Sequence, residues 1–205
     1  MHLTPQESLI NAIYSSVDAA TSRELARLHR EEGITPPCRA GCFYCCRFHI
    51  VTNLAEAHLL AQYVRKTFSV EQMAALRTRT HQWHAWDSSR PGRPAPAATA
   101  QADLSAYEHC CPLLVEGACS AYPARPMVCR THYVSTHPRS CQAASEAASG
   151  ENPPVVLTSV KLSASPFARE IRAQIENAGL DFARATMLLP QCLALEMGWD
   201  FAITP

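Results

Sequence analysis

Apolar residues recur every three or four positions over the first part of the chain, a spacing typical of an amphipathic helix. They predict one long helix, or a broken pair, from about Pro5 to Glu32, with Gly33 as its stop. The stripe consists of Leu9, Ile10, Ile13, Tyr14, Val17, Leu25 and Leu28. Prolines follow at positions 36 and 37. Because proline fixes φ and lacks an N–H, the chain should reach Cys38 in an extended conformation.

Two capping pairs predict two more helices in the next part of the chain. Asn53 with Glu56 predicts a helix to about position 66, after a short strand within 47–52. Ser69 with Gln72 predicts the helix that follows. The inner positions of the two helices are Leu54, Ala57, His58, Ala61 and Val64, and then Met73, Leu76, Thr80, Trp83 and Trp86.

The composition changes after these helices. Residues 88–98 are rich in Pro, Gly and Ala and lack periodicity, which predicts an exposed loop. Residues 111–122 have two short apolar arms about a Glu-Gly turn, a pattern that predicts a β-hairpin. Residues 137–154 are small, polar and proline-bearing, so we expect a second loop there.

The last part of the chain is predicted to be helical again. Residues 155–160 fit either a short strand or the start of a helix. Ser165 and Pro166 are favourable residues for the first positions of a helix that ends near position 177. Residues 180–197 then predict a last helix with a kink or break at Pro190.

These patterns together predict a mostly α-helical single domain, with helices around an irregular cysteine-rich metal-binding core and one small β-hairpin. We expect residues 1–33 to form an N-terminal helical arm and residues 34–140 to form the metal-chelating domain. Residues 141–205 should be a C-terminal helical extension packed on the same domain. At 205 residues the chain can bury a core without disulfides.

Charge and targeting patterns narrow the classes of partner. Lys+Arg 18 balance Asp+Glu 18, so the chain lacks the cationic field that favours nucleic acid or a membrane surface, and we expect neither as a partner. No basic segment with an apolar run opens the sequence, and no apolar window approaches membrane length. We therefore expect a cytoplasmic protein. In that reducing compartment, 10 cysteines favour metal ligation or redox chemistry over structural disulfides.

The cysteines form two groups. Four lie within nine residues, Cys38, Cys42, Cys45 and Cys46, and three candidates lie far downstream, Cys111, Cys119 and Cys129. Thiolates are soft ligands for zinc, iron and iron–sulfur clusters, and two residues between ligands let one turn direct both sulfurs at one ion. Seven candidates exceed the four ligands of one structural zinc. Two zinc ions sharing thiolates, or one four-iron cluster with spare cysteines, both fit this set.

The same residues carry a family resemblance. The first group, followed by Cys111-Pro-Leu-Leu, Gly117-Ala-Cys119-Ser-Ala-Tyr122 and Arg125-Pro-Met-Val-Cys129-Arg130, resembles the YkgJ-type cysteine cluster proteins, or CxxCxxCC zinc- or iron-chelating domains. The resemblance covers roughly residues 38–133. It implies a metal-chelating domain and marks the seven cysteines as its ligand set. The chain has three residues, not two, between its first two cysteines.

Two functional classes follow. The first is a metal-binding protein that holds zinc or iron in a structural or metal-handling role. The second is an iron–sulfur enzyme, such as a protein lysine N-methyltransferase, because some chains with this cysteine pattern resemble flagellin lysine N-methylases. The spacing of the first three cysteines also resembles the cluster loop of radical S-adenosylmethionine enzymes, but the strand–helix alternation of their barrel is missing here. A module that uses its cysteine pairs as disulfides is a further alternative. The sequence leaves open whether the protein is an enzyme.

Several other residues are assigned by context. Cys110 and Cys141 are undecided as ligands, and Cys192 lies in an apolar helical pattern that predicts a small buried residue. Histidine 132 is a candidate to orient a thiolate, and Arg125 and Arg130 are candidates to offset the charge of a polythiolate centre. Histidines 58, 81 and 84 have no second metal ligand at a recognised close spacing in the sequence. We therefore expect them to be packed or solvated side chains on helices.

Overall fold

The computed structural model describes residues 7–89, 110–146 and 153–201. Eight α-helices make up most of these ranges, together with two antiparallel two-stranded sheets. The predicted mostly helical fold with a small hairpin is therefore confirmed. None of the helices in these ranges is long and apolar enough to cross a membrane. The loop predicted at 88–98 falls outside the described residues from position 90 onward.

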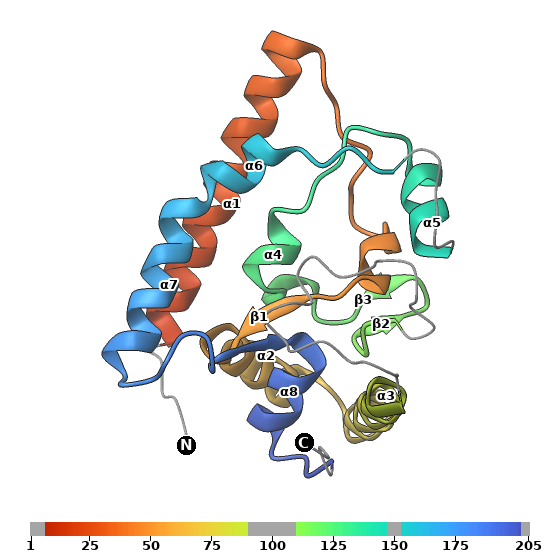
Figure 1. Cartoon of the computed structure of the whole chain (residues 1–205), viewed down its shortest axis with the longest axis vertical. Helices are drawn as coiled ribbons and strands as arrows, with labels where there is room; N and C mark the ends of the chain where they lie inside the picture. The colour runs from red at the N-terminus through yellow and green to blue at the C-terminus, as the bar shows by residue number, and fades with distance from the viewer. Residues whose placement is uncertain (1–6, 90–109, 147–152, 202–205) are drawn as a thin grey trace.

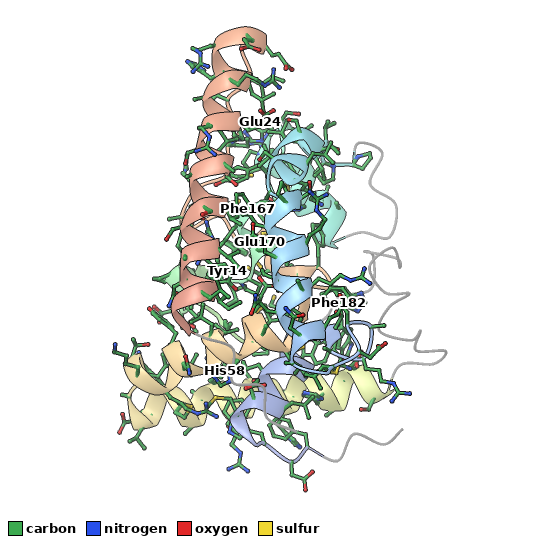
Figure 2. The ribbon with its side chains drawn as sticks, turned by 90° about the vertical axis from the view of Figure 1, so that its left-hand side faces the viewer. Tyr14, Glu24, His58, Phe167, Glu170 and Phe182 are labelled. Carbon is green, nitrogen blue, oxygen red and sulfur yellow. The ribbon has the colours of Figure 1, made fainter. Side chains whose placement is uncertain are left out.

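A long helix, α1 (Glu7–Glu32), runs along one side of the molecule, as its apolar stripe predicts. Helices α6 (Thr158–Ser163) and α7 (Ser165–Asn177) lie beside it in both views (Figures 1 and 2). Tyr14 of α1 and Phe167 of α7 lie between the two helices and belong to one apolar cluster (Figure 2). This packing buries the apolar residues of α1 and α7 in one cluster, which also includes Ala55 and Leu59 of α2. The C-terminal part of the chain therefore helps to hold α1 in place.

Helices α2 (Leu54–Thr67), α3 (Val70–Ser89) and α8 (Leu189–Met197) form the other end of the molecule (Figure 1). Both predicted capping pairs are present. The side chain of Asn53 accepts a hydrogen bond from the Glu56 N–H, and the Ser69 hydroxyl accepts one from the Gln72 N–H. The buried face of α2 is wider than the predicted stripe. It includes Ala55, Glu56, Leu59 and Leu60, while His58 stays partly exposed and binds Glu196.

The prediction of one helix over residues 180–197 is wrong. Strand β4 (Thr186–Leu188) occupies its middle and pairs antiparallel with β1 (Val51–Asn53), with Thr52 opposite Met187. Only α8 is helical, and Pro190 lies in its first turn, where a missing N–H leaves no hydrogen bond unmade. The pairing with β1 therefore overrides a helical pattern in the sequence.

The predicted hairpin is present as β2 (Leu114–Val115) and β3 (Ala118–Cys119). Its turn is formed by Glu116 and Gly117, with φ values of 50° and 77°. Both residues have positive φ, as the tight turns preferred in hairpins require. A side chain at Gly117 would lie 3.6 Å from the Phe43 ring, so the hairpin tip packs against the segment that carries the first cysteine group.

Residues 137–154 are not the loop that their composition predicts. Helix α5 (Pro138–Glu146) occupies most of the described part, beginning at a proline and continuing through residues with good helix propensity. It packs against the short 3-10 helix η1 (Tyr44–Arg47), on the opposite side of the molecule from α7 (Figure 1). Of the two alternatives for residues 155–160, the helix start is present as α6, preceded by an isolated bridge between Val134 and Val156 in place of a strand.

Candidate metal centre

The first cysteine group is carried by two consecutive tight turns. In the first, the Cys42 N–H bonds the Arg39 carbonyl at 3.0 Å, and Gly41 has a φ of 87°. The second turn is η1, which carries Cys45 and Cys46. Because both turns are short and consecutive, four thiols separated by at most eight positions stay on one side of the molecule.

The second group reaches the first through a backbone contact. The Cys111 N–H donates to the Cys46 carbonyl oxygen at 2.7 Å, which anchors the hairpin strand to η1. Strand β3 then carries Cys119, opposite Leu114 in the register. The short helix α4 (Met127–Arg130) carries Cys129. The fold thus assembles cysteines that lie up to 91 positions apart in sequence, Cys38 to Cys129.

Four of these thiols form what we call the inner group: Cys46, Cys111, Cys119 and Cys129. Cys129 lies close enough to Cys111 and Cys119 for their charges to interact, and Cys46 interacts in the same way with Cys111 and Cys129. Cys45 borders this group and lies within electrostatic reach of Cys111, Cys119 and Cys129. The Cys46 S–H donates a hydrogen bond to Cys45, which lowers the pKa of Cys45 to about 7 and raises that of Cys46.

The remaining thiols form an outer group: Cys38, Cys42, Cys45 and Cys141. All four line one cleft of about 70 Å³, and Cys129 also reaches it, whereas the other three inner thiols do not line it. The Cys141 side chain, on α5, is 7% exposed and lies within electrostatic reach of Cys38, Cys42 and Cys45. The sequence left Cys141 undecided. Its helix brings it to the first cysteine group.

Backbone N–H groups point at several of the sulfurs. The Val134 N–H lies 3.4 Å from the Cys38 sulfur, and the N–H groups of Leu113 and Ala121 bond the sulfurs of Cys111 and Cys119. A neutral thiol is a weak acceptor, while a thiolate gains from each such donor. These contacts therefore favour the deprotonated, metal-binding form of three thiols.

Burial works in the opposite direction on most of the cluster. Desolvation raises the pKa of Cys111 to about 12 and that of Cys141 to about 11, and it also raises the pKa values of Cys38, Cys119 and Cys129. All ten cysteines are free, so no disulfide competes for them. The donor set fits a soft metal, because a bound cation would replace these protons and stabilise the thiolates.

The cysteine side chains lie near one another but are not arranged around a common metal position. Over residues 7–89, 110–146 and 153–201, no three Cys, His, Asp or Glu side chains are placed so that they could hold one ion as they stand. A cysteine side chain has one torsion before its sulfur, and rotation between staggered positions relocates that sulfur. Metal binding therefore requires at least some of these side chains to change rotamer.

The two predicted arginines have different surroundings. Arg125 lies beside Cys45 and Cys119. Its positive charge adds to the Cys46 hydrogen bond that lowers the pKa of Cys45, and it opposes the burial that raises the pKa of Cys119. Arg125 also stacks over the Tyr122 ring at 3.7 Å. Arg130 is buried and donates to Asp18 at 2.7 Å and to the Arg125 carbonyl at 2.8 Å. Arg125 is therefore placed to offset thiolate charge, whereas Arg130 ties α4 to α1.

Three other residues near the cysteines or of the same type, His132, Cys192 and Cys110, have different surroundings. His132 lines the cleft, and burial together with the charge of Lys161 lowers its pKa, which favours the neutral ring. Cys192 is fully buried in α8 with its thiol 3.9 Å from the Thr52 carbonyl oxygen, as its apolar surroundings predict. Cys110 adjoins Cys111 in sequence and interacts with its charge.

Glu56 has a role that its spacing from Asn53, which predicts only a capping pair, does not indicate. The Glu56 carboxylate is 3% exposed and accepts hydrogen bonds from the Tyr14 hydroxyl at 3.0 Å and from the Met127 N–H at 2.6 Å. Thr52 and Asn53 donate to its other oxygen. Glu56 thus joins α1, β1 and α2 to the first residue of the helix that carries Cys129.

Comparison with protein-family models matches residues 37–148 to CxxCxxCC, described as "Putative zinc- or iron-chelating domain". The match includes both cysteine groups and α5, and it covers more than half of the chain. No curated protein and no solved structure matches the chain.

Proposed function

The chain belongs to the CxxCxxCC family of zinc- or iron-chelating domains, and from this premise we propose that it binds zinc or iron through its clustered cysteine thiolates. The proposed ligand set contains Cys38, Cys42, Cys45, Cys46, Cys111, Cys119 and Cys129. The observation that carries the proposal is the gathering of thiols from four separate elements around η1, with backbone N–H groups directed at three of the sulfurs.

The role we propose for the metal is structural or metal-handling. The cysteine-bearing elements are short, and η1, the hairpin and α4 contain few buried apolar side chains of their own. Metal bound to the folded state alone would stabilise them, because its binding free energy becomes folding free energy. A reducing, cytoplasmic location suits the ten free cysteines.

Elemental analysis of anaerobically purified protein tests the proposal and separates it from the iron–sulfur enzyme. We expect stoichiometric zinc or iron. Colourless zinc protein favours the structural or metal-handling role, whereas a brown protein with iron and acid-labile sulfide favours the enzyme. Protein without metal, with pairs of cysteines oxidised by mass, would contradict both and favour the redox module.

Zinc binding is expected to release protons. Burial keeps thiols such as Cys111, with a pKa of about 12, neutral at pH 7, and a ligand must be deprotonated. The apparent affinity should therefore rise as pH rises, by about tenfold per pH unit for each proton released. Calorimetric titration of zinc in two buffers of different ionisation enthalpy measures the number of protons. A binding enthalpy that is independent of the buffer would contradict thiolate ligation by neutral thiols.

A further inference from the structure

The eight thiols of the inner and outer groups divide evenly, and the division follows the shape of the protein. Cys38, Cys42, Cys45 and Cys141 share the cleft, while Cys46, Cys111 and Cys119 lie outside its lining. Cys129 also lines the cleft, but it lies within electrostatic reach of Cys111 and Cys119 as well as of Cys45, so it adjoins both groups and we assign it to the inner one. Four thiolates are the complete ligand set of a tetrahedral zinc or of a single iron–sulfur cluster.

We propose that the protein holds two four-thiolate metal centres, and that Cys141 of α5 is the fourth ligand of the outer one. This inference rests on the proposed function and extends its ligand set by one residue. The outer centre consists of Cys38, Cys42, Cys45 and Cys141, and the inner centre consists of Cys46, Cys111, Cys119 and Cys129. Cys45, hydrogen-bonded to Cys46, joins the two.

Contacts around α5 hold Cys141 at the cleft. The Tyr44 hydroxyl, on η1, donates to the Gln142 side-chain oxygen at 3.3 Å, next to Cys141 in sequence. The chain before α5 is fixed on both sides, because the Ser135 N–H bonds the Val155 carbonyl at 2.9 Å and the Val134 N–H approaches the Cys38 sulfur. The segment that contacts the Cys38 sulfur therefore lies only a few residues before the start of α5.

The environment of Cys141 differs from that of the other buried cysteine. Cys192 is enclosed by the apolar residues of α8 and β4 and has no thiol neighbour among the groups that shift its pKa. Cys141 is almost as buried, yet three thiols lie within reach of its charge and it lines an open cleft. Cys192 is therefore the matched control for Cys141, because both thiols are buried but only Cys141 lies near other cysteines.

The two centres should exchange metal at different rates. The outer thiols line a cleft that opens to solvent, whereas Cys129 is the one member of the inner group that reaches this cleft. A chelator in solution reaches an ion in the cleft first. The outer ion is therefore expected to leave in a fast phase and the inner ion in a slow phase.

The Cys141→Ser substitution tests the proposal in the full-length protein loaded with zinc. We expect about two zinc ions per chain in the unsubstituted protein and about one in the variant. With a chromogenic chelator, the fast phase of release should disappear and the slow phase should remain. Cys192→Ala and Cys110→Ser should each keep both ions and both phases.

The possible failures are distinguishable. Unsubstituted protein that binds no zinc overturns the proposed function itself. If it binds zinc but Cys141→Ser keeps the full amount, Cys141 is not a ligand, and if Cys141→Ser loses all zinc while its helical circular dichroism is unchanged, a single shared centre replaces the two. Either result overturns the two-centre assignment.

Alkylation of the unsubstituted protein gives a readout that does not depend on how a variant folds. We expect zinc to protect Cys141 together with Cys38 and Cys42, and the three to become labelled together as the fast phase proceeds. Cys192 should stay unlabelled with or without zinc because it is fully buried and does not line the cleft, whereas the cleft gives the reagent access to Cys141. Labelling of Cys141 at the same rate in zinc-loaded and zinc-free protein would overturn the proposal.

Discussion

The Cys129→Ser substitution is expected to lower both the bound metal and the free energy of unfolding, the latter by several kcal/mol. Cys129 lies on α4, and four residues are too few for a stable helix without outside contacts. A metal bound to Cys129 would tie α4 to η1 and the hairpin, which come from distant parts of the chain. Serine preserves the size of the side chain but replaces a thiolate with a poor ligand.

Metal removal provides the control for this prediction. If the loss of stability comes from the metal, the difference between Cys129→Ser and the unsubstituted protein should nearly vanish when both are measured after treatment with a chelator. Cys192→Ala should show the opposite behaviour. It removes a buried thiol, so we expect a loss of about 1 kcal/mol with or without metal and unchanged metal content. Thermal unfolding paired with elemental analysis measures both quantities, and equal losses for Cys129→Ser in both states would contradict the prediction.

Patterns that depend on neighbouring residues were predictable from sequence. The periodicity of α1 and its end at Gly33, the capping pairs of α2 and α3, and the hairpin at Glu116 and Gly117 all appear in the structure. Each is governed by contacts within a few positions. Short-range chemistry is therefore sufficient to place these elements.

The errors concern segments whose conformation depends on distant partners. Residues 180–188 have helical periodicity, but β4 gains its hydrogen bonds from β1, more than 130 positions away. The composition of residues 138–146 suggested a loop, although Pro138 is also a favourable first residue of a helix and Arg139, Gln142 and Ala143 have good helix propensity. That alternative would have placed Cys141 on a helix. Only the packing of α5 on η1 shows that it faces Cys38 and Cys42.

The candidate site was likewise predictable only where it depends on residues close together in sequence. Cysteine spacing predicted which residue types could bind metal, and the fold brings the predicted thiols of both groups around η1. Spacing could not predict which thiols line the cleft and which do not, since that depends on the Cys111–Cys46 backbone contact and on α5. It also could not identify Glu56, because the donors to its carboxylate come from three separate elements, α1, β1 and α4.

The Glu56→Ala substitution is expected to be the most destabilising change outside the cysteines, by roughly 3–5 kcal/mol. Four donors would lose their acceptor inside the core, two of them the Tyr14 hydroxyl and the Met127 N–H. The substitution would also leave a cavity between α1, α2 and α4. Urea denaturation of the zinc-loaded protein measures the change.

The same substitution should weaken zinc binding, although Glu56 is not a proposed ligand. Its carboxylate holds the first N–H of α4, two positions before Cys129, so its loss frees the helix that presents this thiol. We expect a fall in zinc affinity of about ten- to a hundredfold, the size of effect typical of residues that orient a metal ligand. Competition with a chelator of known affinity measures it under conditions where the variant is still folded.

Two further variants separate this effect from general destabilisation. Ile175→Ala, in the cluster between α1 and α7, should cost roughly 2–5 kcal/mol but leave zinc affinity unchanged in folded protein. Glu56→Gln keeps one oxygen that can accept from Tyr14 and Met127, while its amide group faces the Asn53 amide as a second donor. It should therefore lose about 1–3 kcal/mol and retain most of the zinc affinity. If Ile175→Ala weakens zinc binding as much as Glu56→Ala does, the carboxylate has no specific part in positioning Cys129.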